Sequence, residues 1–330
     1  MSATIHHGDA LEVLKTMPPN SAESVITDPP AGIFFMGKRW DNDKGGKKQW
    51  TAWLQQIASE ALRVAKPGAY ALVWALPRTS NRTADAWEDA GWEILNVVHH
   101  LFGQGFPKSK NLKPAVEHWI LLRKPLIGSI ASNVLIYGTG TLNIDACRAG
   151  TDIISTHNAP KGGFAGGEPN RGSDTSSYAT HQGRWPANLV LTNAEMLAGF
   201  PHTKGCSSPS SATPEGRIFR GRRSQGSIYD DAGSAARYFN QFDNDEAIYI
   251  YAQKANKADR NGSRHPTIKG QDLMKWLVRL ITPPGGTVLD CFAGSGSTGL
   301  AACRQGFSCI LIEKEREYIE DCRKRLAPWL

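Results

Sequence analysis

The sequence of 330 residues predicts an α/β fold: one mostly parallel sheet with helices on both faces, assembled from both ends of the chain. Strand-like apolar runs alternate with helical patterns in the first part of the chain, and the same alternation returns in the last part. A glycine-rich strand-to-helix turn lies so near the C-terminus that 31 residues follow Gly299. A nucleotide-binding sheet needs several more strand-helix units than those residues supply, so the N-terminal part must provide them.

The N-terminal region, residues 1–127, is predicted to form one half of this sheet. Its clearest elements are strands at residues 24–27 and 69–74 and an amphipathic helix at residues 50–64. The helix is expected to end before the Lys-Pro-Gly sequence at residues 66–68, because proline and glycine interrupt a helical backbone.

The middle region, residues 128–245, has a different composition. It is rich in Gly, Ser, Thr, Asn and Arg and is predicted to be a loop-rich insertion between the two halves. Regular patterning returns in the C-terminal region, residues 246–330. The elements expected there are a strand at 247–251, a helix at 271–281, a strand at 287–290, a helix from about Ser297 and a strand at 308–312.

Composition excludes several classes of protein. With 40% hydrophobic and 21% charged residues, the chain is of the globular rather than the disordered type. No apolar stretch approaches the roughly 18 residues that span a bilayer, and the N-terminus lacks a leader pattern, so a cytoplasmic protein with no membrane partner is expected. The net charge of +7 is compatible with a nucleic-acid partner but does not by itself predict one.

The six cysteines predict free thiols rather than a metal site. They include no CxxC pair and no His/Cys cluster at zinc spacing. Most lie in the apolar C-terminal third, where burial as reduced thiols is expected. The adjacent pairs His6-His7 and His99-His100 are expected to be structural, because neighbouring side chains on a strand point to opposite faces.

The first motif with a chemical meaning is the glycine turn. Residues 287–290 form the strand, Gly294, Gly296 and Gly299 follow in a GxGxxG pattern, and Glu313 lies 19 residues after Gly294, at the end of the next strand. Glycines let a ligand approach the backbone closely, and a carboxylate at that strand end can accept hydrogen bonds from both ribose hydroxyls. The pattern predicts a site for a nucleotide-type cofactor; the alternative is a tight turn with no ligand.

The second motif is Asp28-Pro29-Pro30, directly after the strand at residues 24–27. Prolines donate no backbone N–H and favour extended backbone, so the motif presents a carboxylate and bare carbonyls at the C-terminal end of a strand. An exocyclic base amine is a poor nucleophile because its lone pair is delocalised into the ring. If Asp28 and the Pro29 carbonyl accept its two hydrogens, the nitrogen can present that lone pair to a methyl sulfonium. The alternative is a surface Asp-Pro turn.

The two motifs and their order resemble the amino-methylating DNA methyltransferases of the permuted β class. Phe292, Gly294, Gly296 and Thr298 supply the FxGxGxT motif of that family, and Asp28 opens its Asp-Pro-Pro motif. The resemblance implies a Rossmann-like, seven-stranded, mostly parallel methyltransferase sheet, circularly permuted, with the middle region as an inserted target recognition domain. It implies methyl transfer from S-adenosyl-L-methionine to double-stranded DNA by base flipping, with S-adenosyl-L-homocysteine as product and no metal. A homodimer is expected on the same ground.

Asp rather than Ser in this motif is typical of family members that methylate adenine N6, so a site-specific adenine-N6 methyltransferase is expected. Three alternatives stay open. They are a cytosine-N4 methyltransferase, a DNA-binding protein of the same fold with weak or no turnover, and, more remotely, a nicotinamide oxidoreductase.

The resemblance assigns candidate site residues. The catalytic set is Asp28, Pro29, Pro30 and Ala31, which holds the position of the family's stacking aromatic. The cofactor-binding set is Asp9, Asp28, His265, Thr267, Lys269, Asp290, Phe292, Gly294, Gly296, Thr298 and Glu313. Residues 265–269 resemble the HPTxKP segment, with Gly270 where the family usually has Pro. Asp9 resembles the Asp that contacts the cofactor adenine, although a Gly-Asp turn that caps a helix is the simpler interpretation.

Ala31 departs from the family pattern. The family has Tyr or Phe there, and stacking of an aromatic side chain on a base contributes about 1–3 kcal/mol. Its absence predicts weak base capture or slow turnover, unless Phe34 or Phe35 stacks instead. An engineered inactive form would have the same sequence.

DNA contact is expected mainly from the middle region. Guanidinium groups suit phosphate oxygens and the guanine edge alike. The candidates are Arg217, Arg220, Arg222 and Arg223, with Lys108 and Lys110 as a weaker second group. A solvated basic loop is the alternative.

Overall fold

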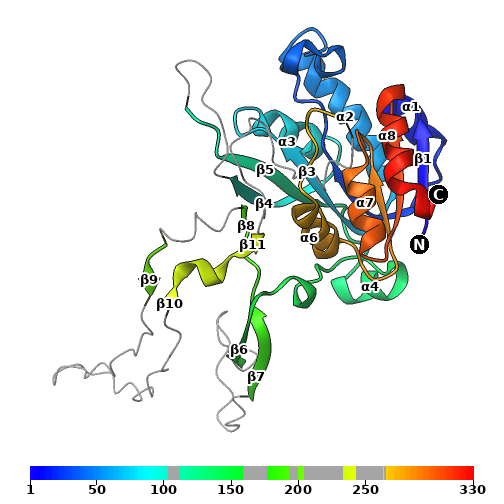
Figure 1. The fold of residues 1–330 in the computed structure, drawn as a ribbon. Helices are drawn as coiled ribbons and strands as arrows, with labels where there is room; N and C mark the ends of the chain where they lie inside the picture. Colours follow the sequence, from blue (N-terminus) through cyan, green and yellow to red (C-terminus); the bar gives the residue numbers. More distant parts are fainter. Residues whose placement is uncertain (103–111, 159–176, 193–199, 204–232, 243–262, 264) are drawn as a thin grey trace, which may run out of the picture.

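The computed structural model describes most of the chain: residues 1–102, 112–158, 177–192, 200–203, 233–242, 263 and 265–330. The strand expected at residues 247–251 lies outside this part. Within it, nine strands form one sheet in the order β1-β13-β12-β2-β3-β5-β4-β8-β11 (Figure 1). Their bounds are β1 Ala3–His7, β2 Ala22–Thr27, β3 Ala65–Ala75, β4 Glu93–Phe102, β5 Val116–Arg123, β8 Leu189–Thr192, β11 Asn240–Phe242, β12 Thr287–Asp290 and β13 Ser308–Glu313.

Both ends of the chain build this sheet, as the sequence predicts. The C-terminal strands β13 and β12 lie between the N-terminal strands β1 and β2, and all four run parallel. In the other half, β5 is antiparallel to both β3 and β4, while the remaining neighbours are parallel. The described sheet has nine strands rather than the expected seven, because β8 and β11 from the middle region extend it beyond β4.

Helices cover both faces of the sheet. Their bounds are α1 Ala10–Thr16, α2 Lys47–Val64, α3 Ser80–Glu88, α4 Ile130–Tyr137, α6 Gln271–Ile281, α7 Ser297–Arg304 and α8 Arg316–Leu326. Short 3-10 turns lie at Phe35–Gly37, Arg39–Asp41, Asp145–Cys147, Ala235–Tyr238 and Ala327–Trp329. The predicted helix at residues 271–281 and strand at 287–290 have the bounds of α6 and β12, so both predictions are confirmed.

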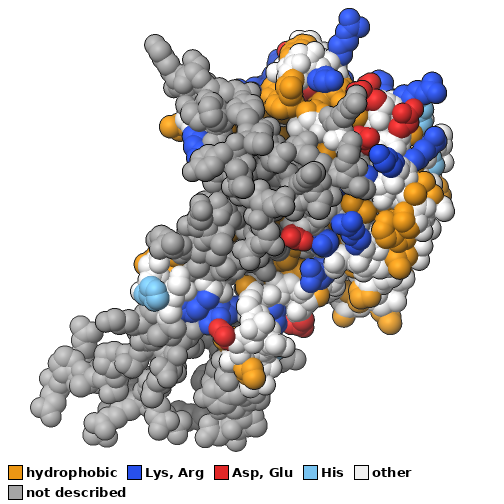
Figure 2. All heavy atoms as spheres, in the orientation of Figure 1, with side chains coloured by type: hydrophobic (Ala, Val, Ile, Leu, Met, Phe, Trp, Pro, Cys, Tyr) orange, Lys and Arg blue, Asp and Glu red, His pale blue; other side chains and the backbone are white. Residues whose placement is uncertain are grey.

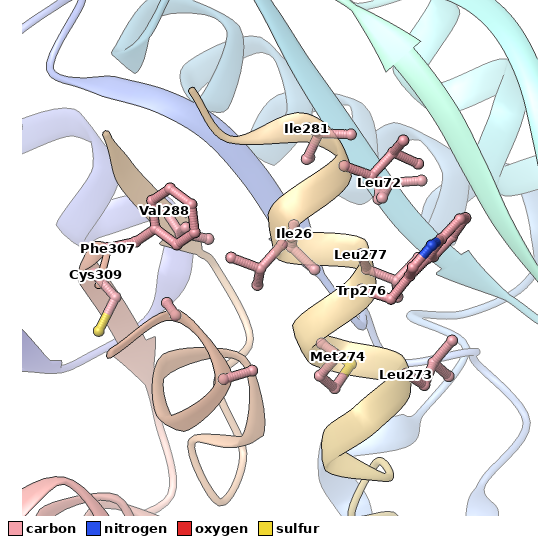
Figure 3. Packing of buried hydrophobic residues seen from close by; sticks show 14 of the residues in the cluster. Ile26, Leu72, Leu273, Met274, Trp276, Leu277, Ile281, Val288, Phe307 and Cys309 are labelled. Atoms are coloured by element: carbon pink, nitrogen blue, oxygen red, sulfur yellow. The ribbon is translucent and has the colours of Figure 1, made fainter. Parts of the chain in front are cut away.

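Successive residues of the central strands point into two different cores. Val25 of β2 and Leu289 of β12 face α1, α2 and α3, whereas Ile26 and Val288 face α6 and α7. In Figure 3, α6 lays its apolar side, including Leu277, against Ile26 and its neighbours. This two-sided burial fixes the register of β2 and β12, because a one-residue slip would exchange the two faces.

The middle region also forms two small antiparallel pairs. The strands are β6 Ala149–Asn158 with β7 Ser177–Arg184, and β9 His202–Thr203 with β10 Gly233–Ser234. Both pairs lie apart from the main sheet in Figure 1, while the two termini lie close together beside β1 and α8. No helix in the described ranges is long and apolar enough to cross a membrane.

Candidate active site

The glycine turn joins β12 to α7 and uses its glycines in different ways. Gly294 and Gly296 have φ values of 54° and 77°, in the left-handed region that favours glycine. A Cβ on Gly294 would lie 3.0 Å from Nε2 of His265, and one on Gly299 would lie 2.6 Å from Cδ1 of Leu311. The first two glycines therefore shape the turn, and the third lets α7 pack closely on β13.

Glu313 ends β13 with its carboxylate against this turn. Its Oε2 accepts a hydrogen bond of 2.7 Å from the backbone N–H of Gly294, and its Oε1 accepts one of 2.7 Å from that of Glu315. Burial raises the pKa of Glu313 to about 7, while these hydrogen bonds lower it. A carboxylate offers about four acceptor sites, so Glu313 can accept further hydrogen bonds from a ligand.

Asp290 ties the glycine turn to the Asp-Pro-Pro motif. It is the last residue of β12, and its Oδ1 accepts hydrogen bonds from the Thr27 hydroxyl at 2.9 Å and from the Phe292 N–H at 3.0 Å. Burial raises the pKa of Asp290 to about 6. Thr27 is the last residue of β2, the parallel neighbour of β12. Asp28 and the glycine turn therefore leave the sheet at the same edge, where open α/β sheets bind ligands.

The Asp28 carboxylate contacts Lys269 just beyond this edge. Nζ of Lys269 lies 3.0 Å from Oδ2 of Asp28 and 3.7 Å from Oε2 of Glu117, and it stands 4.0 Å from the centre of the Trp74 ring. The side chain of Lys269 is 8% exposed and that of Asp28 is 26% exposed. The positive charge of Lys269 thus faces the negative charges of two carboxylates, while Asp28 stays accessible to solvent. A contact between Lys269 and a cofactor stays a prediction.

His265 and Thr267 connect the glycine turn to Lys269. His265 is buried, and its ring lies edge-on to that of Tyr318, with 4.3 Å between the ring centroids. Its Nδ1 accepts a hydrogen bond of 3.3 Å from the backbone N–H of Thr267. Because His265 packs on Gly294 and Lys269 reaches Asp28, residues 265–269 bridge the two motifs. Gly270 has a φ of −60°, a value that proline also adopts.

Asp9 approaches the same edge from β1. The Gly8 N–H donates to the carbonyl of Glu313 at 2.9 Å, and Oδ2 of Asp9 lies 3.2 Å from Nζ of Lys314. Asp9 also caps α1, since Oδ1 accepts a hydrogen bond of 3.1 Å from the N–H of Leu11. The capping interpretation is confirmed, and the same position leaves Asp9 beside Glu313, where a cofactor adenine contact stays a prediction.

A buried aspartate that the sequence analysis missed organises the loop after Asp-Pro-Pro. Asp41 is 1% exposed, and its two oxygens accept hydrogen bonds of 2.8 Å from the N–H groups of Gly32 and Phe35. The Pro30 carbonyl accepts a hydrogen bond of 3.2 Å from Nε1 of Trp50. The loop that carries Ala31 therefore has a defined conformation, fixed from a residue ten positions downstream of Ala31.

This loop presents two apolar side chains to solvent. Phe34 is 53% and Met36 is 74% exposed, and their φ values are 53° and 51°. A non-glycine residue in such a conformation costs about 1–3 kcal/mol, which the surrounding hydrogen bonds must offset. Phe35 is half-buried, so Phe34 is the more accessible of the two candidates to replace the missing aromatic.

A known protein family matches this chain over most of its length. A family model described as DNA methylase, of the N6/N4 type, matches residues 22–324. The chain belongs to this DNA methylase family. The match includes the Asp-Pro-Pro motif and the glycine turn, which the structure brings to one edge of the sheet.

Curated relatives match this chain over shorter stretches. The type II methyltransferase M2.DpnII of Streptococcus pneumoniae is 40% identical over 21% of this chain and 26% of the relative. The type II methyltransferase M.BglI of Bacillus subtilis is 40% identical over 23% of this chain and 21% of the relative. The matches therefore cover about a quarter of the length of these relatives.

Solved structures share the fold of this chain. The PvuII DNA methyltransferase, described as cytosine-N4-specific, matches with a TM-score of 0.56 at 16% identity, over 98% of this chain and 86% of that chain. The M1.HpyAVI complex with S-adenosylmethionine matches with a TM-score of 0.50 at 18% identity, over 98% of both chains. At these identities the likeness shows the fold alone.

The expected DNA-binding residues of this chain lie outside the described residues. This applies to Arg217, Arg220, Arg222, Arg223, Lys108 and Lys110. On the described surface in Figure 2, Lys and Arg side chains lie at several separate places among Asp and Glu. In the described ranges, no group of three or more His, Cys, Asp or Glu side chains is close enough to hold a metal ion.

A second buried acidic group, which the sequence did not predict, lies beside Lys269. Glu117 on β5 is 1% exposed, and it accepts a hydrogen bond of 2.7 Å from Nε1 of Trp74 and lies 2.7 Å from Nδ1 of His100. The available signal was a single glutamate at the start of an otherwise apolar strand, residues 118–122 being mostly apolar. His99 instead lies edge-on to His118, so the adjacent histidines contact different partners, as expected.

Proposed function

We propose that the chain transfers a methyl group from S-adenosyl-L-methionine to an exocyclic base amine in double-stranded DNA, with adenine N6 as the target. One observation carries the proposal. The carboxylate of the Asp-Pro-Pro motif and the glycine turn with Glu313 leave adjacent parallel strands at the same edge, joined by the hydrogen bond between Thr27 and Asp290. Family membership supports the same activity.

The residues of the glycine turn fit the proposed cofactor. Any side chain on Gly294 would fill the space beside His265, and Glu313 holds a carboxylate at the strand end where ribose hydroxyls would donate. When bound, the cofactor supplies an electrophilic methyl group on a sulfonium. Phe292, which is half-buried 5.7 Å from the ring of Trp53, and Asp9 would flank its adenine.

Asp28 and Pro29 would prepare the target amine. Nζ of Lys269 lies 3.0 Å from Oδ2 of Asp28, and the Asp28 side chain is 26% exposed, so a substrate can reach this carboxylate beside Lys269. Asp28 and the Pro29 carbonyl accept the two amine hydrogens, which frees the nitrogen lone pair to form the new C–N bond as the C–S bond breaks with its electron pair left on sulfur. The proton that the methylated nitrogen loses passes to Asp28 or to water. Base flipping is required because the amine is paired inside the duplex.

Nucleoside analysis tests the activity and the choice of base together. Double-stranded DNA is incubated with the protein and methyl-labelled S-adenosyl-L-methionine, then digested and separated. Label in N6-methyladenine supports the proposal, whereas label in N4-methylcytosine would assign the cytosine activity printed for the PvuII enzyme of the same fold. Binding of DNA and cofactor without any transferred label would point instead to a catalytically inactive DNA-binding protein.

Family membership also supports further proposals. We infer that residues 128–245 recognise the DNA sequence, that the protein works in the cytoplasm, and that it forms a homodimer. Deletion of the four-arginine segment would test the first of these through loss of sequence preference, and light scattering would test the last.

Ala31→Tyr is expected to raise methyl transfer several-fold. A tyrosine at this position can stack on the flipped base, an interaction of about 1–3 kcal/mol. The measurement is the single-turnover rate on duplex DNA, with Ala31→Leu as a control that adds bulk without an aromatic face. An unchanged or lower rate for Ala31→Tyr would mean that no aromatic is missing, and loss of activity in Phe34→Ala would then identify Phe34 as the stacking residue.

Cofactor affinity is expected to fall by up to about tenfold between pH 8 and pH 6, because an ionised Glu313 binds ribose hydroxyls more strongly than a neutral one. The raised pKa of about 7 places the change in this window. The stability of the free protein is expected to depend on pH in the opposite direction. Because folding raises the pKa of Glu313 from 4.5 to about 7, the contribution of this group to the free energy of unfolding is complete below pH 4.5 and is lost as the pH rises through 7. Calorimetric titration checks the affinity, and Glu313→Gln is expected to bind weakly with no such pH dependence.

A further inference from the structure

Glu117 is a buried carboxylate with an unusual set of neighbours. It lies on β5, and the groups around it come from three other parts of the chain: Trp74 on β3, His100 on β4 and Lys269 before α6. Taking a carboxylate out of water costs several kcal/mol unless it is well paired. An apolar residue would fill this position at lower cost if the strand needed only to pack.

The contacts of Glu117 lead directly to Asp28. Nζ of Lys269 stands between the two carboxylates, 3.7 Å from Glu117 and 3.0 Å from Asp28. The Trp74 indole contacts both Glu117 and Lys269. Its N–H donates a hydrogen bond of 2.7 Å to Glu117, and the centre of its ring lies 4.0 Å from the Lys269 ammonium. Nδ1 of His100 lies 2.7 Å from the other oxygen of Glu117.

We propose that Glu117, held by Trp74 and His100, is a positioning residue that sets the Lys269 ammonium against Asp28 and balances its charge. This inference rests on the proposed methyl transfer and adds residues to that site. Without Glu117, the whole charge of Lys269 falls on Asp28. The Asp28 carboxylate then accepts hydrogens from the target amine less strongly, and the site gains positive charge where the cofactor sulfonium must lie.

Glu117→Gln keeps the shape of the side chain and removes its charge. The single-turnover rate is expected to fall about tenfold or more, since preorganised charge is worth that much at a reacting centre. The melting temperature is also expected to fall, because the buried Lys269 keeps its charge while one of its two counter-charges is lost. Cofactor affinity is expected to fall less than the rate, because Glu117 touches neither the glycine turn nor Glu313. Trp74→Phe keeps the ring under Lys269 and loses the N–H donor, so a smaller loss of rate is expected.

A double-mutant comparison separates positioning from a structural role. If Glu117 acts through Lys269, Glu117→Gln is expected to cost less than about twofold in a Lys269→Met background. Equal fold losses in both backgrounds would overturn the inference. Glu93→Gln is the matched control: Glu93 lies at the other end of the same strand pair, 2.7 Å from Arg123, and its loss should leave the rate unchanged.

Activity of the wild-type protein distinguishes a failure of the proposed methyl transfer from a failure of the positioning role of Glu117. Wild-type activity with an equally active Glu117→Gln variant would reject the positioning role and leave the proposed function intact. If the wild-type protein itself transfers no methyl group to DNA under conditions where it binds both ligands, the proposed function fails and the inference falls with it.

Discussion

Asp28→Asn is expected to lower the rate of methyl transfer by about 100- to 1,000-fold, the range observed when one preorganised group that stabilises a transition state is removed. The amide has the same shape, but it loses the negative charge and turns a donor toward the amine or toward Lys269, 3.0 Å away. Cofactor affinity is expected to change far less, by under about tenfold, because the glycine turn and Glu313 are proposed to make most of the contacts with the ligand. Single-turnover rates and calorimetric titration measure the two effects separately.

Asp272→Asn provides a matched control for this variant. Asp272 is exposed in the first turn of α6, and its Oδ1 lies 3.0 Å from Nζ of Lys275, the same separation as between Asp28 and Lys269. Removing this surface ion pair is expected to leave the rate unchanged, since exposed pairs contribute about 0–1 kcal/mol. A comparable loss in both variants, or full activity of Asp28→Asn, would show that Asp28 is not at the reacting centre.

Local patterning predicted the fold best where the apolar residues repeat regularly and Gly or Pro marks the ends of the segment. Residues 287–290 have an apolar centre and residues 271–281 are amphipathic, both next to Gly or Pro, and their predicted bounds match β12 and α6. The number of strands was not predictable in the same way. Strands β8 and β11 are only four and three residues long and lie in a region of loop-like composition, so their pairing with β4 depends on tertiary contacts.

The residues of the candidate site also divide into those that local sequence predicts and those that depend on tertiary contacts. The glycine turn and Asp28 could be predicted because their chemistry depends on residues that are adjacent in sequence. Asp41 and Glu117 could not, because each acts on partners that only the fold brings near: Asp41 on the loop N–H groups and Glu117 on Trp74, His100 and Lys269. The single glutamate at the start of an apolar strand is a local signal that Glu117 is buried, but it does not identify the partners that the fold brings to it.

Gly294→Ala is expected to weaken cofactor binding by about tenfold to 100-fold, or about 1.4–2.8 kcal/mol. The new Cβ would lie 3.0 Å from Nε2 of His265, on a backbone with φ of 54°. To relieve the contact, either His265 or the turn must move. The Gly294 N–H donates to Oε2 of Glu313 at 2.7 Å, so movement of the turn also displaces the carboxylate proposed to hold the ribose.

Gly285→Ala separates this steric effect from backbone strain. Gly285 has φ of 74°, in the same left-handed region, but a Cβ there would meet nothing within 4 Å. Both variants are therefore expected to lower the melting temperature through a backbone cost of about 1–2 kcal/mol, while only Gly294→Ala weakens the cofactor. Equal cofactor affinity in the two variants would mean that the turn serves only to pack α7 against the sheet, and that the ligand binds elsewhere.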